Sequence, residues 1–235
     1  MQIIRTIEDL EPGTPSVVKN GSVTMQGTIV GTGSSQPTGY TVTLNGPCSL
    51  RYLRTRVDPV TMPPVAAPAP PKGTRSVTMT KAGQSPGDFA TIRNLTLNGN
   101  VGLVTVPAGN YGNFTVNGAA GFTFGTAGST QPAIYNLQNL TLNSTARIVV
   151  AGPVIVVLAN GLTANGKVGI STQPTWLQVM IASGGLTLNS GCTLAGLVTA
   201  PSGAVIINGS SQLIGSLKCD RLTINGNGVL QGIGN

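Results

Sequence analysis

The chain contains no histidine and very few charged residues. Charged residues make up 8% of its 235 residues, and only six residues are acidic, whereas an ordinary domain is about 25% charged. Without histidine, neither a Ser-His-Asp nor a Cys-His catalytic arrangement can be assembled. The three cysteines, Cys48, Cys192 and Cys219, form no CxxC pair and show no metal-ligand spacing. We therefore expect no zinc site.

The acidic residues are too scattered to predict an enzyme. Glycoside hydrolysis needs two carboxyl groups within about 5 to 10 Å of each other. Three of the acids, Glu8, Asp9 and Glu11, lie together near the N-terminus, and Asp220 stands among basic neighbours much further along. The glycines form no phosphate loop followed by Lys and Ser or Thr. The sequence thus predicts no enzymatic activity, no cofactor and no bound metal.

Aromatic residues and long apolar runs are also scarce. Aromatics are 4% of the chain although hydrophobic residues reach 40%, so the chain has enough apolar material to fold. We expect a core of Val, Ile, Leu, Thr and Ala, a composition that favours strands. The longest apolar run, residues 148–159, is too short to span a bilayer and contains Gly152 and Pro153. The N-terminus carries no visible secretory signal.

What the sequence does contain is a repeated phrase: an apolar residue, usually Thr, another apolar residue, then Asn followed by Gly or Ser. The asparagines that close this phrase are Asn98, Asn117, Asn143, Asn165, Asn189, Asn208 and Asn225. Their spacing, about 17 to 26 residues, is that of one coil of a β-solenoid. The sequence therefore predicts an all-β fold, a parallel β-helix (β-solenoid).

Within the phrase, residues alternate as in a strand with one buried face. Leu186 and Leu188 should point inward and Thr187 outward, and Asn189 then closes the strand. Asn followed by Gly or Ser tolerates the left-handed backbone of a sharp corner, and its amide can hydrogen-bond with the equivalent amides of adjacent coils. We expect structural Asn corners. A row of asparagines that binds a ligand is the alternative.

Two successive coils can be aligned directly. The alignment pairs Leu194 with Leu213 and Ala200 with Cys219, so equivalent positions keep their burial class. A small buried thiol suits an alanine position. We expect structural thiols; a disulfide between Cys192 and Cys219 stays an alternative, although their positions in neighbouring repeats do not match.

Turn residues and prolines predict the domain organisation. Gly or Pro interrupts the chain almost every ten residues, so next to no helix is expected. Four strands are expected in a small N-terminal β module, residues 1–57. Residues 58–74 hold six prolines and predict an extended Pro-rich linker or arm. Residues 75–235 form the solenoid domain. Alternatively, the Pro-rich segment is a loop lying on one domain.

The charges of the chain gather in its first part. Nine of the 13 basic residues lie within residues 1–93. The stretch RYLRTR either contacts an anion or is a solvated strand face. Nucleic acid is not expected as a partner, because no aromatic stacking platform accompanies the charges. We expect the first ~75 residues to make contacts between subunits, and addition of a strand to a neighbour's sheet is one way to make them. The candidate contact residues are Glu8, Asp9, Glu11, Arg51, Arg54 and Arg56.

Residues 184–228, with their Asn-Gly strand ends and the corner GLVTAPSG, resemble the C-terminal repeats of bacterial surface proteins of the choice-of-anchor A type. They are similar, more weakly, to the coils of bactofilins, which polymerise end to end. Either resemblance implies a right-handed parallel β-helix without a catalytic centre. It covers about the last 140 residues of the chain.

The function expected from these observations is structural. A self-assembling subunit of an extracellular filament, sheath or surface layer fits regular coils without chemistry, because uncapped solenoid ends template another subunit. Its main partner would be the chain itself, at the cell surface or outside the cell, with a surface polysaccharide as a second candidate. The alternative function is a carbohydrate-binding adhesin or phage fibre component, for which Trp176 and Tyr111 are the candidate stacking residues.

Overall fold

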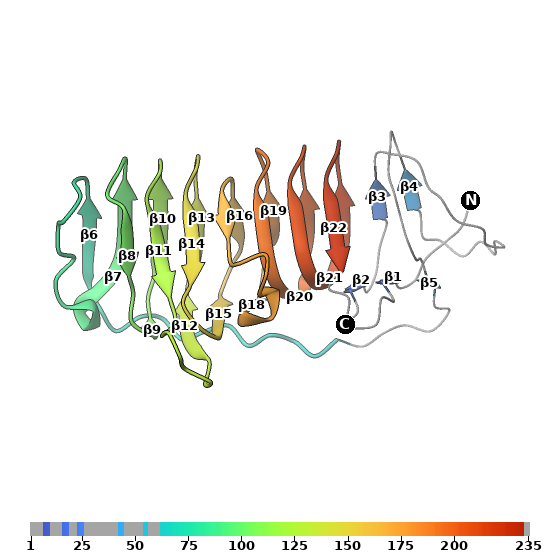
Figure 1. Cartoon of the computed structure of the whole chain (residues 1–235). Coiled ribbons are helices and arrows are strands. Elements are labelled where there is room, and N and C mark those ends of the chain that lie inside the picture. Colours follow the sequence, from blue (N-terminus) through green and yellow to red (C-terminus); the bar gives the residue numbers. More distant parts are fainter. Residues whose placement is uncertain are drawn as a thin grey trace.

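The computed structural model describes residues 62–232 in full, together with the backbone of five short strands nearer the N-terminus. The described residues form an all-β solenoid whose parallel strands stack in about 8 turns (Figure 1). The only helical pieces in this part are two short 3₁₀ turns, η1 (Phe89–Thr91) and η2 (Pro174–Trp176). The predicted β-solenoid fold, almost free of helix, is confirmed.

Each coil contributes strands to three faces, which we call face 1, face 2 and face 3. Face 1 contains, in stacking order, β6 (Arg75–Met79), β7 (Ile92–Asn98), β10 (Asn113–Asn117), β13 (Asn139–Leu142), β16 (Leu162–Ala164), β19 (Gly185–Leu188) and the last parts of β20 (Thr193–Ile207) and β21 (Gln212–Ile224). Face 2 contains β8 (Leu103–Thr105), β11 (Gly121–Phe124), β14 (Arg147–Val150), β17 (Lys167–Val168), the first parts of β20 and β21, and β22 (Val229–Gly232). Face 3 contains β9 (Gly109–Asn110), β12 (Ala133–Leu137), β15 (Val154–Leu158), β18 (Leu177–Ile181) and the middle parts of β20 and β21.

The strands near the N-terminus join the far end of the stack. They are β1 (Ile7–Asp9), β2 (Ser16–Val18), β3 (Val23–Met25), β4 (Val42–Leu44) and β5 (Arg54–Thr55). β2 and β3 pair in parallel with β21, and β4 pairs with β3. β1 pairs antiparallel with β2 and β5. The sheet is therefore continuous across the expected boundary between the N-terminal module and the solenoid, and Figure 1 draws these strands beyond β22.

The register between the last two long strands agrees with the sequence alignment. Leu194 lies opposite Leu213, and Ala200 lies opposite Cys219. The agreement follows from the period of two along a strand, because a shift by one residue would turn the buried residues outward. The repeated phrase therefore sets the register of the coils.

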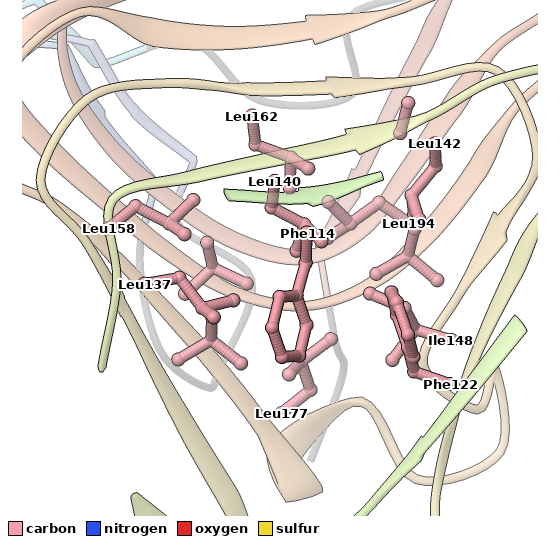
Figure 2. Packing of buried hydrophobic residues seen from close by; sticks show 14 of the residues in the cluster. Phe114, Phe122, Leu137, Leu140, Leu142, Ile148, Leu158, Leu162, Leu177 and Leu194 are labelled. Atoms are coloured by element: carbon pink, nitrogen blue, oxygen red, sulfur yellow. The ribbon is translucent and has the colours of Figure 1, made fainter. Parts of the chain in front are cut away.

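The interior is a continuous apolar core along the axis, and Figure 2 shows buried leucines and phenylalanines from several coils that point into it. Aromatic rings cluster in the first coils: the Phe124 and Tyr135 rings stack with centroids 4.3 Å apart, and those of Phe114 and Phe122 lie 5.1 Å apart. These aromatic residues are thus concentrated in one region of the core.

Threonine does not take the place expected from composition. No threonine belongs to the buried core of the described part; Thr96, Thr115 and Thr141 instead lie in register on the outer side of face 1. The expectation that Thr would help to build the core is wrong. The reason is that the alternating phrase points both its apolar residues inward and leaves Thr outside.

The Pro-rich segment is extended and lies along the coils. Within residues 62–74 no strand forms, and Figure 1 draws the segment beneath the stack from the β21 end to β6. From Met62 to Pro71 its less exposed residues recur every third position: Met62 and Val65 are buried, and Pro68 and Pro71 are half-buried. This is the period of a polyproline II helix, which has three residues per turn.

Candidate functional site

The two carboxylates among residues 62–232 both have local partners. The Asp88 side chain caps η1 by accepting a hydrogen bond from the Ala90 backbone N at 2.9 Å. Asp220 forms an ion pair with Arg221, 3.3 Å from its Nε. No group of three or more His, Cys, Asp or Glu side chains that could hold a metal ion occurs in the part of the chain that the structure describes.

The Asn corners form hydrogen-bonded ladders between coils. The Asn117 amide donates to Asn98 Oδ1 at 2.8 Å, and the Asn143 amide donates to Asn117 Oδ1 at 2.8 Å. Towards the other end, Asn208 donates to Asn189 and Asn225 donates to Asn208, both at 2.7 Å. These side chains hold neighbouring corners together, as the sequence predicts.

The left-handed residue at each of these corners is the one after the asparagine. Ser144 and Ser190 have φ angles of 59° and 58°, and Gly118 has a φ of 88°. Glycine and, less readily, small polar residues accept this backbone. This explains why Gly or Ser follows Asn in the phrase.

Asn165 interrupts the ladder. The strand that follows it, β17, begins at Lys167, two residues later, whereas β14 begins four residues after Asn143. The shorter turn has no counterpart of the left-handed Ser144. The Asn165 Oδ1 atom is buried without a hydrogen-bond partner. The ladder therefore consists of two segments, one on either side of this coil.

A second ladder, at the opposite end of the face 1 strands, was not expected from the sequence. The Asn94 amide donates to Ser76 Oγ at 3.0 Å, and the Asn139 amide donates to Asn113 Oδ1 at 2.7 Å. On face 3, the Asn136 amide donates to Asn110 Oδ1 at 2.6 Å. The signal for the face 1 ladder was present, because an asparagine stands two residues before the central Thr in three successive phrases.

Cys192 and Cys219 are free thiols buried in the core. Burial raises the pKa of the Cys192 thiol to about 12, and burial, followed by the nearby Asp220, also raises that of Cys219. These thiols therefore stay protonated and pack as small apolar groups. This agrees with the structural role expected for them, and Cys48 lies outside the described residues.

The candidate stacking residues for a glycan pack against the core. Tyr111 is 4% exposed, and its hydroxyl donates to the Pro107 carbonyl at 2.8 Å. Trp176 is half-buried and packs against the same core. The buried Tyr111 ring is therefore not available for stacking on a sugar, whereas the Trp176 ring is only partly covered. The adhesin alternative stays a prediction.

The two ends of face 2 carry matching exposed apolar residues that the sequence did not single out. β8 and β22 each pair on one side only among the described strands. Leu103 opens β8 and is 44% exposed, and Val229 opens β22 and is 39% exposed. Each is the first residue of its strand, and the intervening registers place both in one column along the face.

The N-terminal contact candidates are only partly covered by the structure. Glu8 and Asp9 belong to β1 and Arg54 to β5, and the antiparallel register sets Glu8 opposite Arg54 in the same chain. Glu11, Arg51 and Arg56 lie outside the described residues. A role for these residues between subunits stays a prediction.

Comparison with known proteins adds no relative: no family model, curated protein or solved structure matches the chain. The choice-of-anchor A and bactofilin resemblances therefore rest on the motifs alone. Among the described residues, no helix has the length and apolar character needed to cross a membrane.

Proposed function

We propose that the chain is a non-enzymatic structural subunit that self-assembles end to end into an extracellular filament, sheath or surface layer. The observation that supports this proposal is the matched pair of open strands on face 2. An exposed strand edge can accept a strand from another chain. A head-to-tail contact that does not close into a ring produces a filament.

The proposed contact stacks β22 of one copy on β8 of the next in the register used throughout the solenoid. Val229 would then lie opposite Leu103, and Leu230 would lie opposite Val104. Leu230 is half-buried and packs against the core already, so a strand added on face 2 would extend this packing. It would lie beside β3 and β4, which continue face 1 beyond β21. Apolar cross-strand pairs of this kind each contribute about 0.2 to 1 kcal/mol, and burial of the exposed surface adds to this.

Electron microscopy and sedimentation at increasing protein concentration test the proposal. Wild-type protein should form filaments or sheets, and the single variants Leu103→Glu and Val229→Lys should each prevent assembly by placing a charge in the contact. The double variant L103E/V229K should restore assembly, because the two opposite charges would meet between copies. A wild-type protein that stays monomeric at high concentration contradicts the proposal.

Ile134 provides the matched control. It is 48% exposed, but its strand β12 pairs on both sides with β9 and β15. If assembly depends on open edges, Ile134→Lys should assemble as the wild type does. If assembly is only non-specific association of exposed apolar residues, I134K should impair it as strongly as the two end variants do.

A further inference from the structure

The middle of face 2 carries two neighbouring cations without a carboxylate near them. Arg147 opens β14 and Lys167 opens β17, and the two are register partners on adjacent parallel strands. Both are exposed. Adjacent strands lie about 4.8 Å apart, and like charges directly opposite each other destabilise a sheet. The fold gives no structural reason for this pairing.

The surrounding chain offers no compensating negative charge. From residue 89 to residue 219 the sequence contains four basic residues and no Asp or Glu. Among the described residues, neither Arg147 nor Lys167 makes an ion pair; the only carboxylate of the later coils, Asp220, is paired with Arg221. The outer side of face 2 is therefore positive at the two adjacent coils that carry Arg147 and Lys167.

The same column continues with groups that can hydrogen-bond to hydroxyls. In the next coil Thr193 lies opposite Lys167, and in the coil after that Gln212 lies opposite Thr193. On the other side, the Arg147 stem leans over Gly121: an added Cβ there would lie 2.8 Å from Arg147 Cγ. The Arg147 backbone oxygen would lie still closer to that Cβ, so the close approach of the two strands requires glycine at this position.

From this column we infer that face 2 binds an acidic polysaccharide, whose chain lies along the solenoid axis. The binding column is Arg147, Lys167, Thr193 and Gln212. A strand spacing of about 4.8 Å is close to the length of one pyranose unit, so successive sugars meet successive coils. Arg147 and Lys167 bind the carboxylates, the arginine through a planar fork that can contact both oxygens. Thr193 and Gln212 bind sugar hydroxyls.

A polysaccharide fits this column better than a nucleic acid does. Binding of single-stranded nucleic acid relies on aromatic side chains that stack on the bases. Tyr111, Tyr135 and the core phenylalanines are buried, and no aromatic residue belongs to the binding column. This inference does not depend on the proposed self-assembly, because the column lies within one chain.

The experiment measures binding of the full chain to polygalacturonate at low ionic strength, with neutral dextran and single-stranded DNA as comparison ligands. The wild type should bind polygalacturonate, and added salt should weaken binding because the contacts are exposed charge pairs. The double variant R147Q/K167Q should bind at least about tenfold more weakly, equivalent to about 1.4 kcal/mol. The charge-preserving variant R147K/K167R should retain most of the affinity.

The matched control removes the same charge elsewhere. Lys72 and Lys81 are exposed and lie outside the binding column, so K72Q/K81Q should change the affinity by less than about threefold. Circular dichroism verifies that both double variants fold. Equal weakening by the two double variants overturns the inference, as does undetectable binding by the wild type. Equally tight binding of DNA through Arg147 and Lys167 overturns the choice of a polysaccharide.

Discussion

The chain has two kinds of Asn corner, so the same substitution, Asn to Ala, is expected to change stability differently at each. Asn208 lies inside a ladder segment: it donates to Asn189 Oδ1 and accepts from the Asn225 amide, both at 2.7 Å. Asn165 ends its strand in the same way, but its Oδ1 is buried without a partner. Replacing each by alanine compares a side-chain amide that hydrogen-bonds to both neighbouring coils with one whose buried oxygen has no partner.

The expected cost of Asn208→Ala follows from its two side-chain hydrogen bonds. Each such bond contributes about 1 kcal/mol net, and the loss leaves partners on two neighbouring coils unsatisfied. We expect a loss of about 2 to 3 kcal/mol in the free energy of unfolding. For a chain of this size, that corresponds to a decrease in Tm of about 4 to 12 °C. Asn165→Ala removes a buried acceptor without a partner, so it should be neutral or stabilising.

Urea unfolding followed by circular dichroism, together with thermal scans, measures both variants. Because solenoids can unfold coil by coil, each transition needs a second probe such as Trp176 fluorescence to verify that it is cooperative. If Asn165→Ala destabilises the protein as much as Asn208→Ala does, then the amide ladder is not the source of the stability at these corners. An Asn208→Ala variant as stable as the wild type would refute the reasoning equally.

Further predictions concern alkaline pH and the Pro-rich segment. Burial and, to a smaller extent, the nearby Tyr135 raise the pKa of Tyr111 from its ordinary 10.0 to about 12. As the pH rises, this tyrosine therefore loses its proton in the unfolded chain before it does so in the folded one. The free energy of unfolding should fall between pH 10 and pH 12 for this reason. Urea midpoints across this range should fall less steeply in Tyr111→Phe, and an unchanged slope would exclude Tyr111 as a source. Val65 is buried and its neighbour Ala66 is exposed, so Val65→Ser should lower stability by about 1.5 to 3 kcal/mol and speed proteolysis of residues 62–74. Ala66→Ser should do neither; equal proteolysis of the two variants would contradict the docked polyproline II arrangement.

The position of the Pro-rich segment also limits how the N-terminal strands can reach a neighbour. A polyproline II helix rises about 3.1 Å per residue, so the nine steps from Met62 to Pro71 span about 28 Å, or about six coils at 4.8 Å each. Gln138 donates to the Pro68 and Ala69 carbonyls, both at 3.4 Å, and Thr74 N donates to Thr91 O at 3.1 Å. The segment is thus attached along its own solenoid.

The sequence by itself determined the repeat, the inward and outward sides of each strand and the corners. A phrase such as LTLNS specifies a two-residue period and a left-handed residue after Asn189, and both are local properties of the backbone. Stacking identical phrases then sets the register, which is why the pairing of Ala200 with Cys219 could be derived without coordinates. The burial of Cys219 followed from the same alignment.

Only the tertiary structure decided which residues of different coils share a column and which strands have no neighbour. Arg147 and Lys167 are 20 positions apart in the sequence. Because the turn after Asn165 is shorter than the turn after Asn143, this spacing differs from the spacing of the two asparagines. Only the pairing of β14 with β17 shows that the two cations are neighbours. Leu103 and Val229 look like ordinary strand residues, and they are exposed at the two ends of face 2, where β8 and β22 each pair on one side only among the described strands. The parallel pairing of β2 and β3 with β21 likewise joins strands from opposite ends of the sequence. Such contacts depend on how many coils stack and where the chain returns, which no local phrase encodes.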